Sequence, residues 1–146
     1  MKKSSQKNRP IICSACLLGL ATRYDGKIKA NKKVLDLVKS ELLIPVCPEQ
    51  LGGQSTPRKN AEICGKKVVE ADGADVSAEF KKGAREVLKI VKFNGVEKAI
   101  FKQRSPSCGC GQVYDGSFSG KIIKGDGITT KLLKKNGIKV TSEEDL

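Results

Sequence analysis

The chain has 146 residues, six cysteines, no histidine and a formal net charge of +12. Without histidine, the chain has no imidazole zinc site and no Ser-His or Cys-His nucleophile pair, so catalysis must use carboxylates, thiolates, hydroxyls, lysines or a bound metal. The length suits a single domain, predicted over 10–146 behind a basic disordered tail at 1–9.

The surplus of basic residues is compatible with simple solubility or with attraction of an anionic partner such as a nucleotide or RNA. Lysines outnumber arginines 23 to 5, and six aromatic residues give little surface for base stacking, so nucleic-acid binding is an alternative that is not favoured. No apolar stretch is long enough for a membrane span or a signal peptide, and we expect a cytoplasmic protein without a membrane partner. In that reducing compartment, six cysteines predict metal-binding or catalytic thiols.

In chain order, the first predicted element is a strand over 10–14. It leads into a turn that carries Cys13 and Cys16, and this turn is the first candidate position for a functional thiol. Asn31 predicts the N-cap of a helix over about 32–40, because its side chain can accept a hydrogen bond from the first turn.

The apolar run 42–49 predicts a second buried strand that ends in Cys47 and Glu49. Pro45 is unusual there, because a central strand cannot spare a backbone donor. The stretch 51–58 is too rich in glycine and proline for a helix, and it predicts a polar loop of the kind that lines binding sites.

The middle of the chain predicts a hairpin followed by the longest helix. Residues 61–69 form the predicted hairpin, with Gly65 at its turn. Apolar residues at helical spacing predict a helix over 77–93, with Ser77 as its cap.

A third buried strand is predicted over 98–101, and a loop over 104–111 follows it. Pro106 fixes the path of this loop, which presents Cys108. The remaining elements are predicted as a hairpin or irregular lid over 113–123, a helix over 127–135 and a short strand over 138–141.

Strands that alternate with helices predict a single-domain, Rossmann-like α/β fold, with a parallel sheet, flanking helices and a small β-hairpin insertion. Such sheets bind ligands beyond the carboxyl ends of their strands. We therefore expect Cys13 or Cys16, together with Cys47 and Cys108, to converge at one edge of the sheet.

Three thiolates without a histidine suit an iron–sulfur cluster with one open iron, and suit a zinc ion less well. A redox pair formed by Cys13 and Cys16 is the alternative, but it leaves the other two thiols without a task.

Eight motifs together resemble those of the DUF523 family, which includes the thiouracil desulfidases. The resemblance runs from about residue 11 to residue 143. The motifs are Ser14-Ala15-Cys16-Leu17-Leu18-Gly19, Arg23-Tyr24-Asp25-Gly26, Pro45-Val46-Cys47-Pro48-Glu49, Pro57-Arg58, Gly73-Ala74-Asp75-Val76, Gly83-Ala84, Ser105-Pro106-Ser107-Cys108-Gly109 and Tyr114-Asp115-Gly116.

This resemblance implies a [4Fe-4S] cluster that is held by Cys16, Cys47 and Cys108 and whose fourth, open iron binds the sulfur of a thiolated uracil. It also implies that Glu49 and Ser105 are the catalytic acid/base and proton-handling residues. The implied reaction is a non-redox conversion of 4-thiouracil, 4-thiouridine or 4-thio-UMP to the uracil-type product, with release of sulfide.

Six further residues are predicted to form the wall of the substrate pocket, and the arginines among them suit a phosphate. The wall residues are Arg23, Tyr24, Asp25, Arg58, Arg104 and Tyr114. Two other functions stay open: a sulfur transferase that acts on a nucleotide or tRNA, and a basic RNA-associated module with structural zinc. The sequence assigns no role to the additional thiols of Cys13, Cys64 and Cys110.

Overall fold

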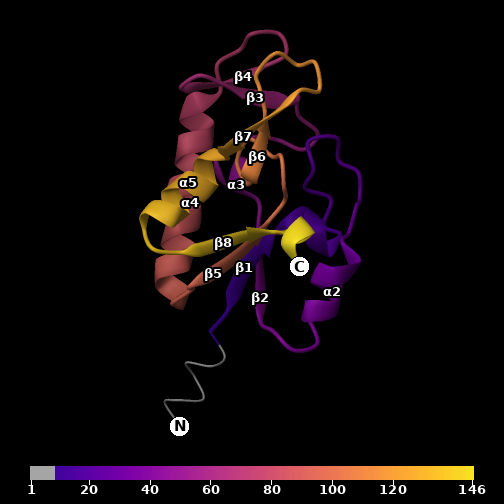
Figure 1. Cartoon of the computed structure of the whole chain (residues 1–146), viewed down its shortest axis with the longest axis vertical. Coiled ribbons are helices and arrows are strands. Elements are labelled where there is room, and N and C mark those ends of the chain that lie inside the picture. Colours follow the sequence, from indigo (N-terminus) through magenta and orange to yellow (C-terminus); the bar gives the residue numbers. More distant parts are fainter. Residues whose placement is uncertain (1–8) are drawn as a thin grey trace.

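The structure is a computed structural model that describes residues 9–146. The predicted tail lies outside the described residues except for Arg9, whose Nη1 donates a hydrogen bond to the carbonyl of Gly95 over 2.9 Å. A four-stranded parallel sheet in the order β2-β1-β5-β8 forms the centre of the molecule (Figure 1). Its strands are β1 (Ile11–Ser14), β2 (Leu43–Val46), β5 (Lys98–Phe101) and β8 (Lys139–Ser142).

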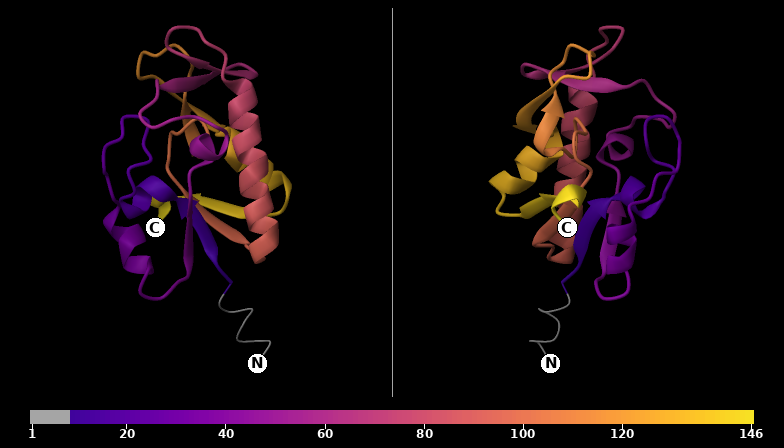
Figure 2. Two further views of the ribbon diagram at one scale, coloured as in Figure 1. Left: turned by 180° about the vertical axis from the view of Figure 1, so that it is seen from behind. Right: turned by 45° about the vertical axis from the view of Figure 1, so that its right-hand side comes forward.

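Helices cover both faces of this sheet (Figures 1 and 2). The helices α4 (Ser77–Asn94) and α5 (Ile128–Lys135) pack on one face, and the short α2 (Lys32–Leu37) packs on the other. Side chains of β1 alternate accordingly, because Ile12 joins the core under α4 and α5 whereas Cys13 packs beside α2. The predicted α/β fold with a parallel sheet is confirmed.

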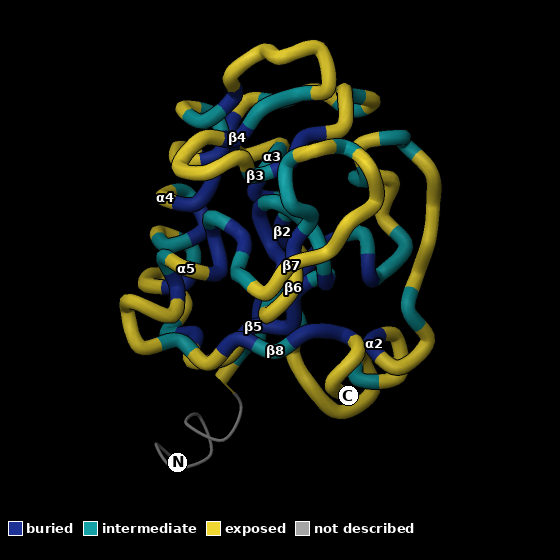
Figure 3. The backbone as a smooth tube through the Cα atoms, turned by 45° about the horizontal axis from the view of Figure 1, so that its top comes forward, coloured by how far each residue is buried: buried dark blue, intermediate teal, exposed yellow. Residues whose placement is uncertain are grey.

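Two antiparallel hairpins extend beyond the sheet. The hairpin of β3 (Ala61–Cys64) and β4 (Lys67–Glu70) confirms the one predicted at Gly65. The second hairpin, of β6 (Cys110–Tyr114) and β7 (Ile122–Asp126), begins before the predicted range. In Figure 3 the buried stretches run through the sheet and the facing helices, whereas exposed stretches gather in the loops. None of the helices in residues 9–146 is long and apolar enough to span a membrane.

The helix caps agree with the sequence in one case and differ in the other. Asn31 caps α2 as predicted, because its Oδ1 accepts a hydrogen bond from the amide of Val34 over 3.1 Å. The predicted Ser77 cap of α4 is wrong, because the Ser77 hydroxyl instead accepts from the amide of Val68 on the neighbouring hairpin. The N-cap position is Val76, and the carboxylate of Asp75 before it accepts from the amide of Ser77 over 2.9 Å.

The sequence did not predict α3 (Pro48–Leu51), which directly follows β2. Pro48 occupies the first turn of α3, where a missing backbone donor has no cost. Pro45 is tolerated because β2 is an edge strand of the sheet. The chain therefore turns from strand to helix within two residues of Cys47.

Two glycines bring α3 against α4 backbone to backbone. A Cβ added at Gly83 of α4 would lie 1.9 Å from the carbonyl oxygen of Pro48, and one added at Gly52 would lie 2.1 Å from that of Glu79. No side chain fits between these backbones. The packing on α4 thus fixes the position of α3 and of every residue that α3 carries.

We predict that Gly83→Ala destabilises the protein by about 2 kcal/mol or more, because the added methyl group forces α3 away from α4. Helix propensity alone predicts the opposite sign, a gain of roughly 1 kcal/mol for alanine over glycine. Urea unfolding monitored by circular dichroism measures the difference. Lys82→Ala, at the adjacent exposed position of the same helix, is the control and should change stability little. An unchanged or raised stability for Gly83→Ala would contradict this account.

Candidate active site

Three thiols that are far apart in sequence line one cavity of about 540 Å³. Cys16 lies in the 3-10 helix η1 (Ala15–Leu18) after β1, Cys47 lies between β2 and α3, and Cys108 lies in the loop after β5. Each thiol therefore follows the carboxyl end of a parallel strand. The convergence that the sequence predicts is confirmed.

The other three thiols do not line this cavity. Cys13 is fully buried in the core cluster that contains Val34 of α2. The Cys110 Sγ donates to the carbonyl of Val140 over 3.3 Å, and Cys64 is exposed on the hairpin. Of the two cysteines that the sequence left open after β1, Cys16 is the one that faces the cavity.

Burial keeps the cavity thiols protonated in the absence of a positive partner. It raises the pKa of Cys16 to about 11, although the nearby Lys102 ammonium opposes the shift. Burial also raises the pKa of Cys47 and of Cys108. A metal that binds here must displace these protons, and its positive charge would offset the cost of the buried thiolates.

The donor set fits a group larger than one ion. Among residues 9–146, no three Cys, Asp or Glu side chains gather around a point as ligands of a single metal ion do. The three cavity sulfurs instead come from separate walls of one hollow. Such an arrangement suits a polynuclear centre whose separate metal atoms each meet one thiolate.

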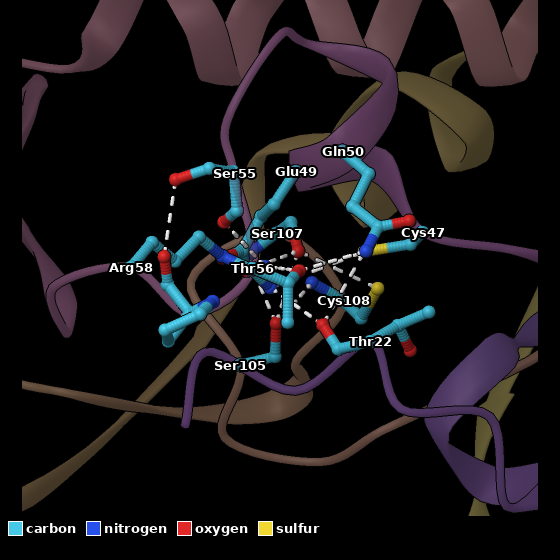
Figure 4. Close-up of polar contacts among 11 residues, drawn as sticks. Thr22, Cys47, Glu49, Gln50, Ser55, Thr56, Arg58, Ser105, Ser107 and Cys108 are labelled. Atoms are coloured by element: carbon cyan, nitrogen blue, oxygen red, sulfur yellow. Dashed lines mark hydrogen bonds and ion pairs between the residues drawn. The ribbon is translucent and has the colours of Figure 1, made fainter. Parts of the chain in front are cut away.

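The carboxylate of Glu49 lies in this cavity and is held from two sides (Figure 4). Its Oε1 accepts from Nε of Arg58 over 2.8 Å, and its Oε2 accepts from the hydroxyl of Ser107 over 3.0 Å. Only 14% of the Glu49 side chain and 7% of the Arg58 side chain are exposed. The pair is thus largely desolvated, and the carboxylate has a fixed orientation.

The guanidinium of Arg58 ties three segments together around Glu49. Its Nη2 donates to the carbonyl of Thr22 over 2.8 Å, and its Nη1 donates to the hydroxyl of Thr56 over 2.8 Å. The same Nη2 lies 3.9 Å from the sulfur of Cys47 (Figure 4). Arg58 is therefore a clamp that fixes Glu49 in the site, and its guanidinium donors are already occupied by acceptors of the protein.

Two serines continue the hydrogen-bond chain away from Glu49. The Ser105 Oγ lies 3.0 Å from the Ser107 Oγ and accepts from the amides of Ser107 and Cys108. Ser107 has one hydroxyl proton, and Oε2 of Glu49 at 3.0 Å is a nearer and stronger acceptor for it than the Cys108 sulfur at 3.5 Å. With that proton directed to Glu49, the Ser105 hydroxyl is the donor to Ser107. The chain runs from Ser105 through Ser107 to the carboxylate.

The first turn of α5 holds the loop that carries these serines. The amides of Ile128 and Thr129 donate to the carbonyls of Pro106 and Ser107 over 2.9 Å each. The Thr130 hydroxyl donates to the carbonyl of Cys108 over 3.0 Å. The loop backbone is therefore anchored independently of anything that binds in the cavity.

The predicted wall residues line the cavity with one exception, Asp25. Asp25 instead binds Arg23 through two hydrogen bonds of 3.1 and 3.0 Å, and Arg104 is paired with Glu144. The side chains of Tyr24 and Tyr114 also line the cavity. The roles of these residues in substrate binding stay predictions, but each predicted arginine already has a carboxylate partner.

Sequence reasoning missed several residues that line or support the cavity. Ser107 stood inside a quoted motif, directly before a predicted ligand, and that position was its only signal. Lys102 lines the cavity and is held by the buried carboxylate of Glu143 over 3.0 Å, from the 3-10 helix η2 (Glu143–Asp145) after β8. Glu62 and Phe118 also line it, and no local pattern marks either one.

Comparison with known proteins agrees with this geometry. A family model described as 2-thiouracil desulfurase matches residues 11–145. An uncharacterized protein of Bacillus subtilis (strain 168), YbbK, is 42% identical to this chain, and the alignment covers 93% of this chain and 97% of the relative. A solved structure of a [4Fe-4S]-dependent thiouracil desulfidase, TudS, is similar with a TM-score of 0.89 and 44% identity, over 94% of this chain and 93% of that one.

We predict that Arg58→Ala lowers the free energy of unfolding by about 3 kcal/mol, because it leaves the buried Glu49 carboxylate without its cation. Arg58→Lys should recover little of the loss, since an ammonium cannot replace the fork of donors to three segments. Urea titration of the metal-free protein measures both variants. Arg85→Ala, on the exposed side of α4, is the matched control and should be near neutral. A wild-type-like Arg58→Ala would contradict the clamp.

Proposed function

The chain belongs to the 2-thiouracil desulfurase family, and from that premise we propose that it is an iron–sulfur enzyme that replaces the sulfur of a thiouracil-type base with oxygen. The observation that carries the proposal is the meeting of three strand-end thiols with one clamped carboxylate in a single cavity. The relative of solved structure supports the proposal, because it is a [4Fe-4S]-dependent thiouracil desulfidase at 44% identity.

Cys16, Cys47 and Cys108 are the residues that would hold the cluster, leaving one iron without a protein ligand. When bound, a [4Fe-4S] cluster of this kind supplies a Lewis acid for the thiocarbonyl sulfur. Support for this ligand set comes from the cavity, which all three thiols line and which Cys13, Cys64 and Cys110 do not reach.

The reaction needs water and a base but no electron. A thiocarbonyl and one water give a carbonyl and one hydrogen sulfide, so the atoms balance without a reductant. Glu49 accepts a proton from the attacking water, and its clamp of Arg58 and Ser107 holds the receiving oxygens in place. Ser105 donates to Ser107 and extends this chain, and reversal of both hydroxyls would give the proton of Glu49 a path away from the carboxylate.

The cavity supports a neutral base as the substrate better than it supports recognition of a phosphate. Arg23, Arg58 and Arg104 are each paired with a carboxylate, so none of the three offers a free fork. A preference for thio-UMP therefore stays a prediction from sequence. So does a cytoplasmic location, for which the six free thiols are the argument.

We predict that the anaerobically reconstituted protein binds four irons with acid-labile sulfide, as the name of the similar desulfidase indicates. Alanine at Cys16, Cys47 or Cys108 should abolish cluster retention, measured by iron analysis and absorbance. Alanine at Cys13 or Cys64 is the matched control and should retain the cluster, because neither thiol lines the cavity.

The same reconstituted protein should release sulfide from 2-thiouracil or 4-thiouracil, followed by loss of the thiocarbonyl absorbance. Both isomers are required, because the family description names the 2-isomer and the sequence predicted the 4-isomer. One tightly bound zinc per chain in place of iron would contradict the proposal and favour a structural module. A cluster without turnover of either isomer would favour sulfur transfer instead.

We predict that Glu49→Gln lowers kcat by about 100-fold, because the amide cannot accept the proton of water. Ser107→Ala should lower kcat by about 10- to 100-fold with little change in KM, since it removes the hydrogen bond that orients Glu49. Iron content should stay at the wild-type level in both variants. Ser40→Ala, in an exposed turn, is the control. Full activity in Ser107→Ala would contradict the proposed chain.

A further inference from the structure

A second carboxylate, that of Glu62 on β3, lines the cavity apart from the Glu49 chain. The residue is only 5% exposed, and an ionised group this deeply buried needs partners to offset its desolvation. It has no cation within hydrogen-bond distance among the described residues. Its role is therefore distinct from that of the clamped Glu49.

One oxygen of Glu62 holds the loop between β6 and β7. Oε1 accepts from the amides of Gly116 and Phe118 over 3.0 and 3.1 Å. Phe118 takes a left-handed backbone conformation with φ of 57°, which is unfavourable for an aromatic residue and persists only when its surroundings impose it. The loop also lies tightly against β3, since a Cβ at Gly116 would be 2.7 Å from the carbonyl oxygen of Ile63.

The other oxygen is available to the cavity. No donor within residues 9–146 forms a hydrogen bond with Oε2 of Glu62, whereas Oε1 has two. Among residues 9–146, the side-chain polar atom that is fully buried without a hydrogen-bond partner is Thr129 Oγ1. Oε2 of Glu62 also lacks a partner there but is not such an atom, so it is not fully buried. A carboxylate oxygen without a donor in the described part of the chain is therefore accessible on a residue that lines the cavity.

Aromatic side chains also line the cavity. Phe118 and Tyr114 line it from the loop and from β6, and Tyr24 lines it as well. Flat rings favour stacking on a flat pyrimidine, while the edge of that pyrimidine must satisfy its polar groups. A carboxylate beside aromatic walls selects an N–H at that edge and repels a carbonyl oxygen.

Resting on the proposed function, we propose that Oε2 of Glu62 accepts the N3–H of the thiouracil ring and orients the base in the cavity. N3 lies between C2 and C4, so this contact is adjacent to the reacting carbon whichever of the two carries sulfur. N3–H also remains in a nucleoside, where N1 bears the sugar. Glu62 is thus a specificity-determining residue that simultaneously anchors the wall of the site.

The test compares uracil, 1-methyluracil and 3-methyluracil as probes that bind to the reconstituted protein without turnover, by anaerobic calorimetry. Wild-type protein should bind uracil and 1-methyluracil about 10- to 100-fold more tightly than 3-methyluracil, the range expected for a hydrogen bond to a buried charge. Glu62→Gln should lose this discrimination, because its amide oxygen can still accept from the loop while its NH₂ replaces the acceptor. Glu70→Gln, on the partner strand and outside the cavity lining, is the matched control.

Amide resonances of Gly116 and Phe118 that match those of wild type would show that Glu62→Gln keeps the loop in place. Equal binding of 1-methyluracil and 3-methyluracil by the wild type overturns the inference whatever the variant does. Retained discrimination in Glu62→Gln overturns it too. Sulfide release together with either of these results leaves the proposed function standing, whereas N3–H discrimination without sulfide release supports Glu62 and rejects the desulfidase activity.

Discussion

The site depends on the parallel direction of three neighbouring strands. β1 pairs with β2 and with β5 in parallel, so all three strands end at the same edge of the sheet. Whatever residues follow those ends must share one space. Cys16, Cys47 and Cys108 are separated by 31 and 61 residues along the chain, and this constraint brings them toward one cavity. In a short metal-binding motif the ligands are close because they are neighbours in sequence. Here the pairing of parallel strands brings distant thiols close together.

Charge pairing shapes the inside of that cavity. The protein carries a net charge of +12, yet the cationic side chains Arg58 and Lys102 that line the site are each bound to a buried carboxylate, of Glu49 and Glu143 respectively. Burial makes such pairing necessary, because an unpaired ion loses its hydration without compensation. Lys29 also lines the cavity, but it is an exposed residue and has no ion pair among the described residues. For a neutral base, recognition then rests on individual hydrogen bonds and stacking rather than on attraction between opposite charges.

Local sequence patterns identified most elements but not every cap and short connection. The period of apolar residues placed α4 and the sheet strands, because that period reflects which side faces the core. Ser77 looked like a cap, yet its hydroxyl accepts from the neighbouring hairpin, and its own amide donates to the carboxylate of Asp75. The one-turn helix α3 was missed because its formation depends on the close approach of Gly83 from α4, a contact that no local pattern contains.

By itself, the sequence determined the fold class, the strand-end positions of the three thiols and, through its motifs, the family. Those properties follow from hydrophobic periodicity and from residues that stand next to one another in the chain. Only the tertiary structure decided that Cys16 rather than Cys13 faces the cavity, that Arg58 clamps Glu49, and which residues from distant segments complete the walls. Glu62 is one of these wall residues, and Glu143 holds another, Lys102. Their partners are more than 30 residues away in the chain, and contacts over such separations exist only after the sheet and its hairpins have assembled.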